Sequence, residues 1–248
     1  MEDVDITQRQ IEILRRIIEE YTQTGQPVGS DLLEKKYKIG ASPATIRNEM
    51  VVLAKKGYLS KSYFSSGRLP TAKAFRFYIK HLLEPQDLST LEAVGFKNSI
   101  WDEREEIHRL LRHAAKVLAE RTKLLSLALS EEGDFYYCGI ANILNFQEFM
   151  EEERLSSIFE RFEDDLFWSR MFKKLDRLQE ELMVFLGEED IPDPTLHKLA
   201  GVLGEFRGKR VSGVIGVVGP KRIYYEEVIP KVRYLSSLIS QILIEQGY

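Results

Sequence analysis

The residues best suited to chemistry in this sequence are the basic ones between Ser42 and Leu82. The stretch contains eight Lys and Arg residues and one acid, Glu49, on a chain whose formal net charge is −4. Charges farther apart than a Debye length of about 8 Å are largely screened, so the local sign decides whether a segment attracts phosphate. Such a segment is typical of a DNA-binding surface, and it also fits a solvated basic face. The basic residues are Arg47, Lys55, Lys56, Lys61, Arg68, Lys73, Arg76 and Lys80.

Three helices are predicted in and before this stretch. A capping-box pattern at Thr7 and Gln10 begins the first, and apolar residues follow it at helical spacing. A short second helix is expected after Gly29, followed by a tight connection. Ser42 and Pro43 suit the N-cap and the first position of a third helix. This order predicts a helix-turn-helix, which places the last of its helices in the major groove of DNA.

The third helix and the segment after it supply the candidate DNA contacts. The exposed N-terminal face of the helix would offer polar groups to base edges or phosphates, and its C-terminal lysines would contact phosphates. A hairpin is predicted directly after the helix, as in a wing, with Arg68 at its tip for a minor groove or a phosphate. The predicted DNA-binding residues are Ser42, Thr45, Arg47, Asn48, Lys55, Lys56, Lys61, Ser66 and Arg68.

The remaining reactive residues do not form a pattern expected of an enzyme. His108 and His113 are five positions apart, which is off a common helical face, and Cys138 is the only cysteine. The segment 204–209 resembles a phosphate loop but is one residue short, and Arg210 stands where Ser or Thr would bind magnesium. A β-turn is the better interpretation of that segment. We therefore expect no catalytic site, no metal and no cofactor.

Neither membrane insertion nor secretion is predicted. No apolar run approaches the roughly 18 residues that suggest a membrane span. The sequence starts with the acidic residues 2–5, unlike a secretory signal or an Arg-rich transit peptide. With a single cysteine as well, a cytoplasmic protein is expected.

The rest of the chain predicts a second, α+β domain. We expect a winged helix-turn-helix domain at 1–82, a linker at 83–105 and a regulatory domain at 106–248. Periodicity predicts helices over 101–126, 155–162, 166–186 and 225–244, and strands over 125–129, 135–140 and 210–218. Gly213, Gly216 and Gly219, spaced by three in an apolar strand, indicate close backbone packing rather than a dinucleotide site.

The sequence resembles the HrcA family of bacterial heat-inducible transcription repressors. The resemblance is dense over residues 6–80 and returns near the end of the chain, with a shorter segment, ANILN, at 141–145. The segments that carry it are YTQTGQPVGS at 21–30, SPATIRNEM at 42–50, KGYL at 56–59, SGRLPT at 66–71, GVIGVVGPKRIYY at 213–225 and VIPKVRYL at 228–235.

This resemblance implies a homodimer that binds double-stranded DNA at an inverted-repeat operator upstream of chaperone genes and represses them. It also implies activity supported by a GroEL-type chaperonin, and a GAF-like domain that carries an inserted dimerising domain. Here 130–134 is a short turn where family members continue toward that insert. The expected fold is thus α+β, with an N-terminal winged helix-turn-helix followed by a reduced GAF-like α+β regulatory domain.

A second hypothesis from another functional class stays open. The winged helix and the acidic C-terminal region would form a protein-interaction module that binds a protein partner. Salt separates the two hypotheses, because binding through several phosphates weakens steeply as salt rises.

Overall fold

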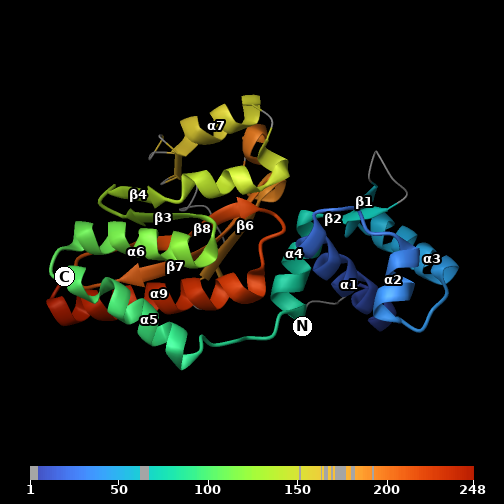
Figure 1. Cartoon of the computed structure of the whole chain (residues 1–248), viewed down its shortest axis with the longest axis horizontal. Coiled ribbons are helices and arrows are strands. Elements are labelled where there is room, and N and C mark those ends of the chain that lie inside the picture. The colour runs from blue at the N-terminus through green and yellow to red at the C-terminus, as the bar shows by residue number, and fades with distance from the viewer. Residues whose placement is uncertain are drawn as a thin grey trace. The chain divides into compact units, whose positions relative to one another are not determined.

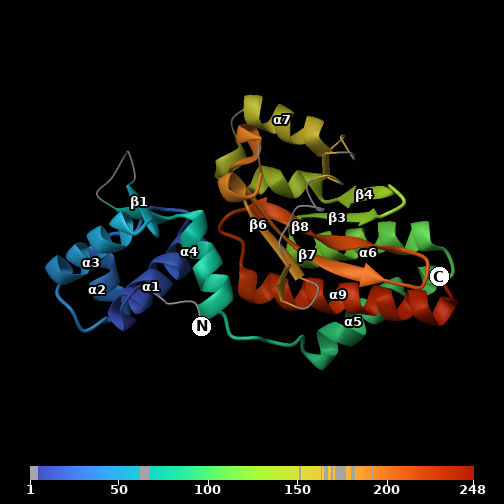
Figure 2. The ribbon, with the colours of Figure 1, turned by 180° about the vertical axis from the view of Figure 1, so that it is seen from behind.

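A computed structural model describes residues 5–61, 67–150, 152–162, 164, 167–168, 170, 177–179, 182–191 and 193–248. The chain divides into two compact units, Met1–Leu83 and Glu84–Tyr248. Figures 1 and 2 show both units.

The first unit consists of helices around a small core, followed by a β-hairpin. The helices α1 and α3 pack on each other and on α2, and side chains such as Leu14, Leu33 and Ile46 are fully buried between them. The strands β1 and β2 are antiparallel, with Lys61 opposite Arg68. The elements in chain order are α1 (Gln8–Thr24), α2 (Ser30–Tyr37), α3 (Pro43–Lys55), β1 (Leu59–Lys61), β2 (Arg68–Pro70) and α4 (Ala72–Phe77), which continues into a π-helical turn (Tyr78–Leu82).

Side-chain caps define where these helices begin. The predicted capping box is confirmed, since the Thr7 N–H donates to Gln10 Oε1 at 3.1 Å and the Gln10 N–H donates to Thr7 Oγ1 at 3.3 Å. Ser42 caps α3 with Pro43 directly after it, and Thr71 caps α4. Each cap satisfies a backbone N–H that has no partner within its helix.

Among the described residues of the second unit, six strands form an antiparallel sheet in the order β4-β3-β8-β7-β6-β5. Its strands are β3 (Leu125–Ser130), β4 (Phe135–Cys138), β5 (Arg177–Gln179), β6 (Leu182–Leu186), β7 (Leu199–Arg207) and β8 (Ser212–Pro220). Its main helices are α5 (Thr90–Ile100), α6 (Ile107–Thr122), α7 (Glu152–Phe162) and α9 (Tyr225–Gln246). Short 3₁₀ turns lie at Trp101–Glu103, Ile140–Asn145, Gln147–Phe149, Gly187–Glu189 and Pro194–Leu196.

Helices cover both faces of this sheet. The helices α6 and α9 lie side by side on one face, α6 over β3 and β4 and α9 over β7 and β8 (Figure 2). The other face carries an aromatic cluster, in which Phe149, Phe162, Trp168 and Phe185 are fully buried. Side chains alternate between the two faces along β3, and Leu125, Leu127 and Leu129 accordingly all belong to that cluster.

The predicted linker at 83–105 is wrong over much of its length. Residues 90–100 form α5, whose Phe96 and Ile100 are fully buried. The Tyr234 hydroxyl of α9 also donates to the Ala93 carbonyl at 3.0 Å. The helix predicted over 101–126 accordingly begins later, at Ile107. Its end also differs, because residues 125–130 form β3.

Three strands, β5, β6 and β7, occupy positions that the sequence pattern assigned otherwise. Of the helix predicted over 166–186, residues 167, 168 and 170 are helical, while 177–179 and 182–186 are strands. Residues 204–207, predicted as a turn, belong to β7, and the turn begins at Gly208. The β6 strand is buried along its whole length, so its apolar run shows no alternation to separate it from a buried helix.

Other predicted elements are confirmed. Strands form at 125–130, 135–138 and 212–220, and helices at 152–162 and 225–246. The close packing predicted for the β8 glycines is present at Gly216, where an added Cβ would lie 2.1 Å from the Val202 carbonyl oxygen. Only glycine therefore fits this position.

Candidate nucleic-acid interface

The N-terminal end of α3 is held by its own polar side chains. The Ser42 hydroxyl accepts from the Thr45 backbone N–H at 3.2 Å and lies 3.0 Å from the Thr45 hydroxyl. Ser42 is exposed and Thr45 is half-buried. The two predicted contacts are thus joined to each other at the start of the helix.

One face of α3 is exposed along its whole length. Arg47 and Asn48 lie on it together with Ala44, Val51 and Lys55, at helical spacings of three and four. The opposite face is buried, with Ile46 and Leu53 fully buried and Met50 nearly so. We call Ala44, Arg47, Asn48, Val51 and Lys55 the α3 stripe. Val51, with 37% of its surface exposed, was missed from the sequence because an apolar residue in a helix is normally assigned to the core.

The single acid of α3, Glu49, lies outside this stripe. Glu49 accepts a hydrogen bond from Gln10 Nε2 at 2.8 Å, and Arg9 Nη1 lies 4.0 Å from its other oxygen. Both partners belong to α1. The carboxylate therefore ties two helices together, and no acid interrupts the stripe.

The two neighbouring lysines at the end of α3 differ in their surroundings. Lys55 is exposed and makes no ion pair or hydrogen bond with the part of the chain that the structure describes. Lys56 is half-buried, and its ammonium donates to the Asp5 carbonyl. The Tyr58 hydroxyl donates to Asp5 Oδ1 at 2.9 Å, and burial, together with that carboxylate, raises the pKa of Tyr58 to about 12. Lys56 thus anchors the end of α3, while Lys55 is open to a ligand.

The hairpin is attached to the helices by its second strand. The N–H and C=O groups of Val28 and Arg68 bond each other reciprocally at 2.9 Å, which adds a third, one-residue strand to the hairpin. Gly67 is required beside this bridge, because a Cβ there would lie 2.8 Å from Pro27 Cβ and 2.9 Å from the Pro27 carbonyl carbon. Nothing in the local sequence pattern indicates that Val28 pairs with residues so far along the chain.

This attachment corrects the expectation that Arg68 lies at the hairpin tip. Arg68 is the first residue of β2 and is half-buried, with Nη1 donating to the Gly67 carbonyl at 3.4 Å. Both of its backbone hydrogen bonds are made with Val28, and Lys61 lies opposite it in the hairpin register. Lys61 is exposed at the end of β1. Ser66, also predicted as a contact, lies outside the described residues.

A buried carboxylate joins the two helices that precede α3. Glu20 of α1 accepts from Lys36 Nζ at 2.6 Å and from the Tyr37 hydroxyl at 2.7 Å, both of α2. Burial by itself raises the pKa of Glu20, but the hydrogen bonds from Lys36 and Tyr37 outweigh it and leave the pKa below its ordinary value. This link sets α2 against α1 and thereby the turn that leads into α3.

Two further observations concern the described residues only. No three His, Cys, Asp or Glu side chains among them are grouped as a metal site requires. None of their helices has the length and apolar character needed to cross a bilayer.

Comparison with known proteins identifies the family. The family model for the HrcA protein C-terminal domain matches residues 47–229, well over half of the chain. The relatives are named as transcription repressors rather than enzymes, in agreement with the expectation that this chain is not an enzyme.

The similarity to individual relatives is strongest over about half of the chain. The heat-inducible transcription repressor HrcA of Lysinibacillus sphaericus is 41% identical over 127 residues, which cover 51% of this chain and 37% of that protein. The repressor of Clostridium tetani is 42% identical over 128 residues, covering 51% and 36%. These alignments therefore span little more than a third of the relatives' length.

Weaker similarity extends over the whole chain. The HrcA repressor of Roseiflexus castenholzii is 24% identical over an alignment of 344 positions that covers 97% of this chain and 95% of that protein. A crystal structure described only as that of a hypothetical protein shares the fold, with a TM-score of 0.79 at 18% identity over 98% of this chain and all of the other. Together with the family model, these similarities show that the chain belongs to the HrcA family of heat-inducible transcription repressors.

Proposed function

We propose that this chain is a sequence-specific DNA-binding repressor of chaperone genes, acting in the cytoplasm as a homodimer on an inverted-repeat operator. Its first unit would be a winged helix-turn-helix and its second a reduced GAF-like regulatory domain. Membership of a family whose members are named heat-inducible transcription repressors supports the general class. The operator, the dimer and the target genes are inferences from the family resemblance.

The observation that carries this proposal is the α3 stripe. Arg47 and Asn48 are exposed near the capped N-terminus of α3, where a recognition helix reads base edges. Arg can donate two hydrogen bonds to guanine and Asn can pair with adenine, while Ala44 and Val51 suit the methyl groups of thymine. Ser42 and Thr45 at the helix start and Lys55 at its end would contact phosphates.

The hairpin formed by β1 and β2 would lie beside the helix. Lys61 is exposed at the end of β1 and would reach a phosphate beside the groove. Arg68 and Lys56 are held within the unit, so their contribution would be to position the hairpin and α3 rather than to read bases. A dimer would place two α3 helices on half-sites separated by multiples of about 10–10.5 bp.

Fluorescence anisotropy with a labelled duplex tests the proposal. The duplex would carry the inverted repeat from the promoter of the organism's own chaperone operon, and a scrambled duplex of equal length would be the control. We expect tight binding to the repeat alone, with log K falling by about 0.9 per phosphate contact for each unit of log salt. A GroEL-type chaperonin, added in a parallel series, would raise the fraction of active repressor.

The competing function is a protein-interaction module. The exposed apolar residues Ala44 and Val51 would also suit a protein partner. Absence of binding to any duplex at low salt, with and without chaperonin, would refute the repressor proposal and favour this module.

A further inference from the structure

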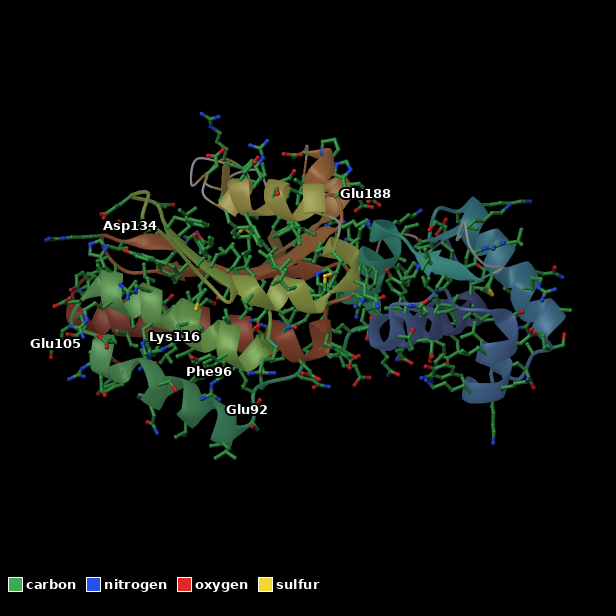
Figure 3. The ribbon with its side chains drawn as sticks, turned by 45° about the horizontal axis from the view of Figure 1, so that its top comes forward. Glu92, Phe96, Glu105, Lys116, Asp134 and Glu188 are labelled. Carbon is green, nitrogen blue, oxygen red and sulfur yellow. The ribbon has the colours of Figure 1, made fainter. Side chains whose placement is uncertain are left out.

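A second concentration of basic side chains lies in the other unit, along a groove between α6 and β4. The groove has a volume of about 650 Å³. His108, Arg109, Arg112, His113 and Lys116 of α6 line it, together with Glu103 and residues 136–138 of β4. Figure 3 marks Lys116 on α6 and Asp134 in the turn between β3 and β4. The proposed DNA-binding function uses none of these residues.

The two ends of the groove differ in charge. At the N-terminal end of α6, acids are already paired, since Glu103 Oε2 lies 2.7 Å from Arg109 Nε and Asp134 Oδ2 lies 3.5 Å from His108 Nδ1. The Tyr136 hydroxyl also hydrogen-bonds His108 Nδ1 at 2.8 Å. The acids at this end therefore already contact basic side chains of the protein itself.

The other end carries two cations, Arg112 and Lys116, with His113 beside them on α6. Arg112, His113 and Lys116 make no hydrogen bond or ion pair with any residue that the structure describes. Arg112 and Lys116 are both exposed and one helical turn apart, about 6 Å along the axis, so they can reach separate anionic groups of one ligand. The whole chain is acidic, with a net charge of −4, which makes an uncompensated basic groove unusual.

The edge of the sheet adds a backbone donor. Among the described strands, β4 pairs only with β3. The Ser130 N–H donates to the Asp134 carbonyl. In an antiparallel ladder, residue pairs are alternately hydrogen-bonded and not hydrogen-bonded, so Tyr137, three residues beyond Asp134, belongs to a pair without hydrogen bonds to β3. The N–H of Tyr137 consequently points to the free edge, beside the groove. Cys138, the only cysteine of the chain, lines the same groove and is half-buried.

We propose that this groove binds a small anion that carries two or more phosphate groups. Arg112 and Lys116 would hold different phosphates, and His113 and the Tyr137 N–H would donate to the remaining oxygens. A second copy of this chain is a poorer occupant, because pairing two β4 edges would bring the two basic α6 faces against each other. The ligand would be either an inorganic oligophosphate or a nucleoside polyphosphate, which share this chemistry.

Alkylation of Cys138 provides a readout that α3 does not influence. The full chain would be treated with neutral iodoacetamide, with and without sodium tripolyphosphate, and the modified fraction measured by intact mass spectrometry. Ligand at about ten times its Kd should slow alkylation by about tenfold, since about a tenth of the sites remain open. ATP, pyrophosphate and orthophosphate would be compared, with sulfate at matched ionic strength as the control anion.

Paired variants make the test specific. Arg112→Glu with Lys116→Glu should lower the affinity for the protecting anion by about a hundredfold, because each charged contact contributes about tenfold to the affinity. Lys209→Glu with Arg210→Glu makes the same charge change at exposed residues of the β7–β8 turn, and should leave protection unchanged. Thermal unfolding of each variant checks that the fold is intact, and Arg112→Gln with Lys116→Gln repeats the test without added acids.

The outcomes separate cleanly. Protection that requires Arg112 and Lys116 supports the proposal, and stronger protection by ATP than by tripolyphosphate would identify the nucleoside polyphosphate as the source. The proposal is overturned by an unchanged alkylation rate, by equal slowing with sulfate, or by protection that survives in the Arg112 and Lys116 variants. None of these results depends on whether α3 binds DNA.

Discussion

The α3 stripe and the α6 groove are both basic surfaces, yet they present their charges differently. On α3, the cations Arg47 and Lys55 alternate with the small or apolar Ala44 and Val51 on the outside of a helix whose one acid is bound to α1. On α6, the cations face a strand edge across a groove, and at one end Glu103 is paired with Arg109. A convex helix with small residues between its cations can enter a groove of DNA, whereas a concave surface can surround a small ligand. Positive charge alone would not distinguish them.

The largest effect is expected from removing the support beneath the α3 stripe. Ile46 is fully buried against the other helices of the first unit, so Ile46→Ala should lower the free energy of unfolding by about 2–5 kcal/mol. Circular dichroism during thermal unfolding measures this change, and Val51→Ala on the exposed side is the control. Protection of Cys138 by tripolyphosphate should persist, because the groove lies in the other compact unit. If Ile46→Ala also abolished the protection of Cys138 by tripolyphosphate, the two surfaces would not be independent.

The next effect tests the role of the stripe itself. Arg47→Ala should cost about 1–3 kcal/mol of operator binding if Arg47 contacts a base with two hydrogen bonds. Anisotropy titrations against operator and scrambled duplexes measure the loss. Lys35→Ala, at an exposed lysine of α2, is the matched control and should bind normally. An equal loss on both duplexes would reassign Arg47 to a phosphate contact.

The adjacent lysines sharpen the contrast between binding and anchoring. Lys55→Ala should reduce the slope of log K against log salt by about 0.9, the value for one phosphate contact, with unchanged thermal stability. Lys56→Ala should instead lower stability, because Lys56 donates to Asp5 at the end of α3. Salt titrations and unfolding curves for both variants check this division. Equal changes in salt slope and in stability for the two variants would contradict the inference that Lys56 is anchored while Lys55 binds phosphate.

The smallest effect concerns pH and is confined to the first unit. The folded-state pKa of Glu20 lies below its ordinary value of 4.5, so its pairing stabilises the unit above that value and the stabilisation is lost as pH falls through the folded-state pKa. Unfolding measured between neutral and acidic pH should show this loss, and Glu20→Gln should flatten it. Arg47→Ala should leave the pH dependence of stability unchanged. A Glu20→Gln variant with the parent's acid sensitivity would show that other carboxylates dominate.

Local signals predicted the position of α3 and its cap well. Ser42, Pro43 and the periodicity of Ile46, Met50 and Leu53 define α3 without reference to the rest of the chain. The exposed positions of Arg47 and Asn48 follow from the same period, whereas the exposed Val51 was missed. The capping box at Thr7 is equally local. By contrast, the sequence pattern predicted Arg68 at the hairpin tip. Its position in β2 depends on pairing with Val28, which lies far away along the chain and leaves no local signal.

The second unit shows where sequence patterns fail. The β6 and β7 strands are covered on both faces, so their apolar runs have no period, and β6 was predicted as helix. The linker predicted at 83–105 contains α5, which is stabilised by burial of Phe96 and Ile100 rather than by a strong amphipathic pattern.

The sequence by itself determined the helix caps, the exposed face of α3 and the concentration of basic residues around it, because these depend on residues at most a few positions apart. It also carried the family resemblance. Only the tertiary structure decided that Glu49 turns toward α1, that Lys56 is anchored to Asp5 while Lys55 is open, and that α6 faces the free edge of β4. Each of these contacts joins residues that lie far apart along the chain, and a local pattern contains no record of the partner.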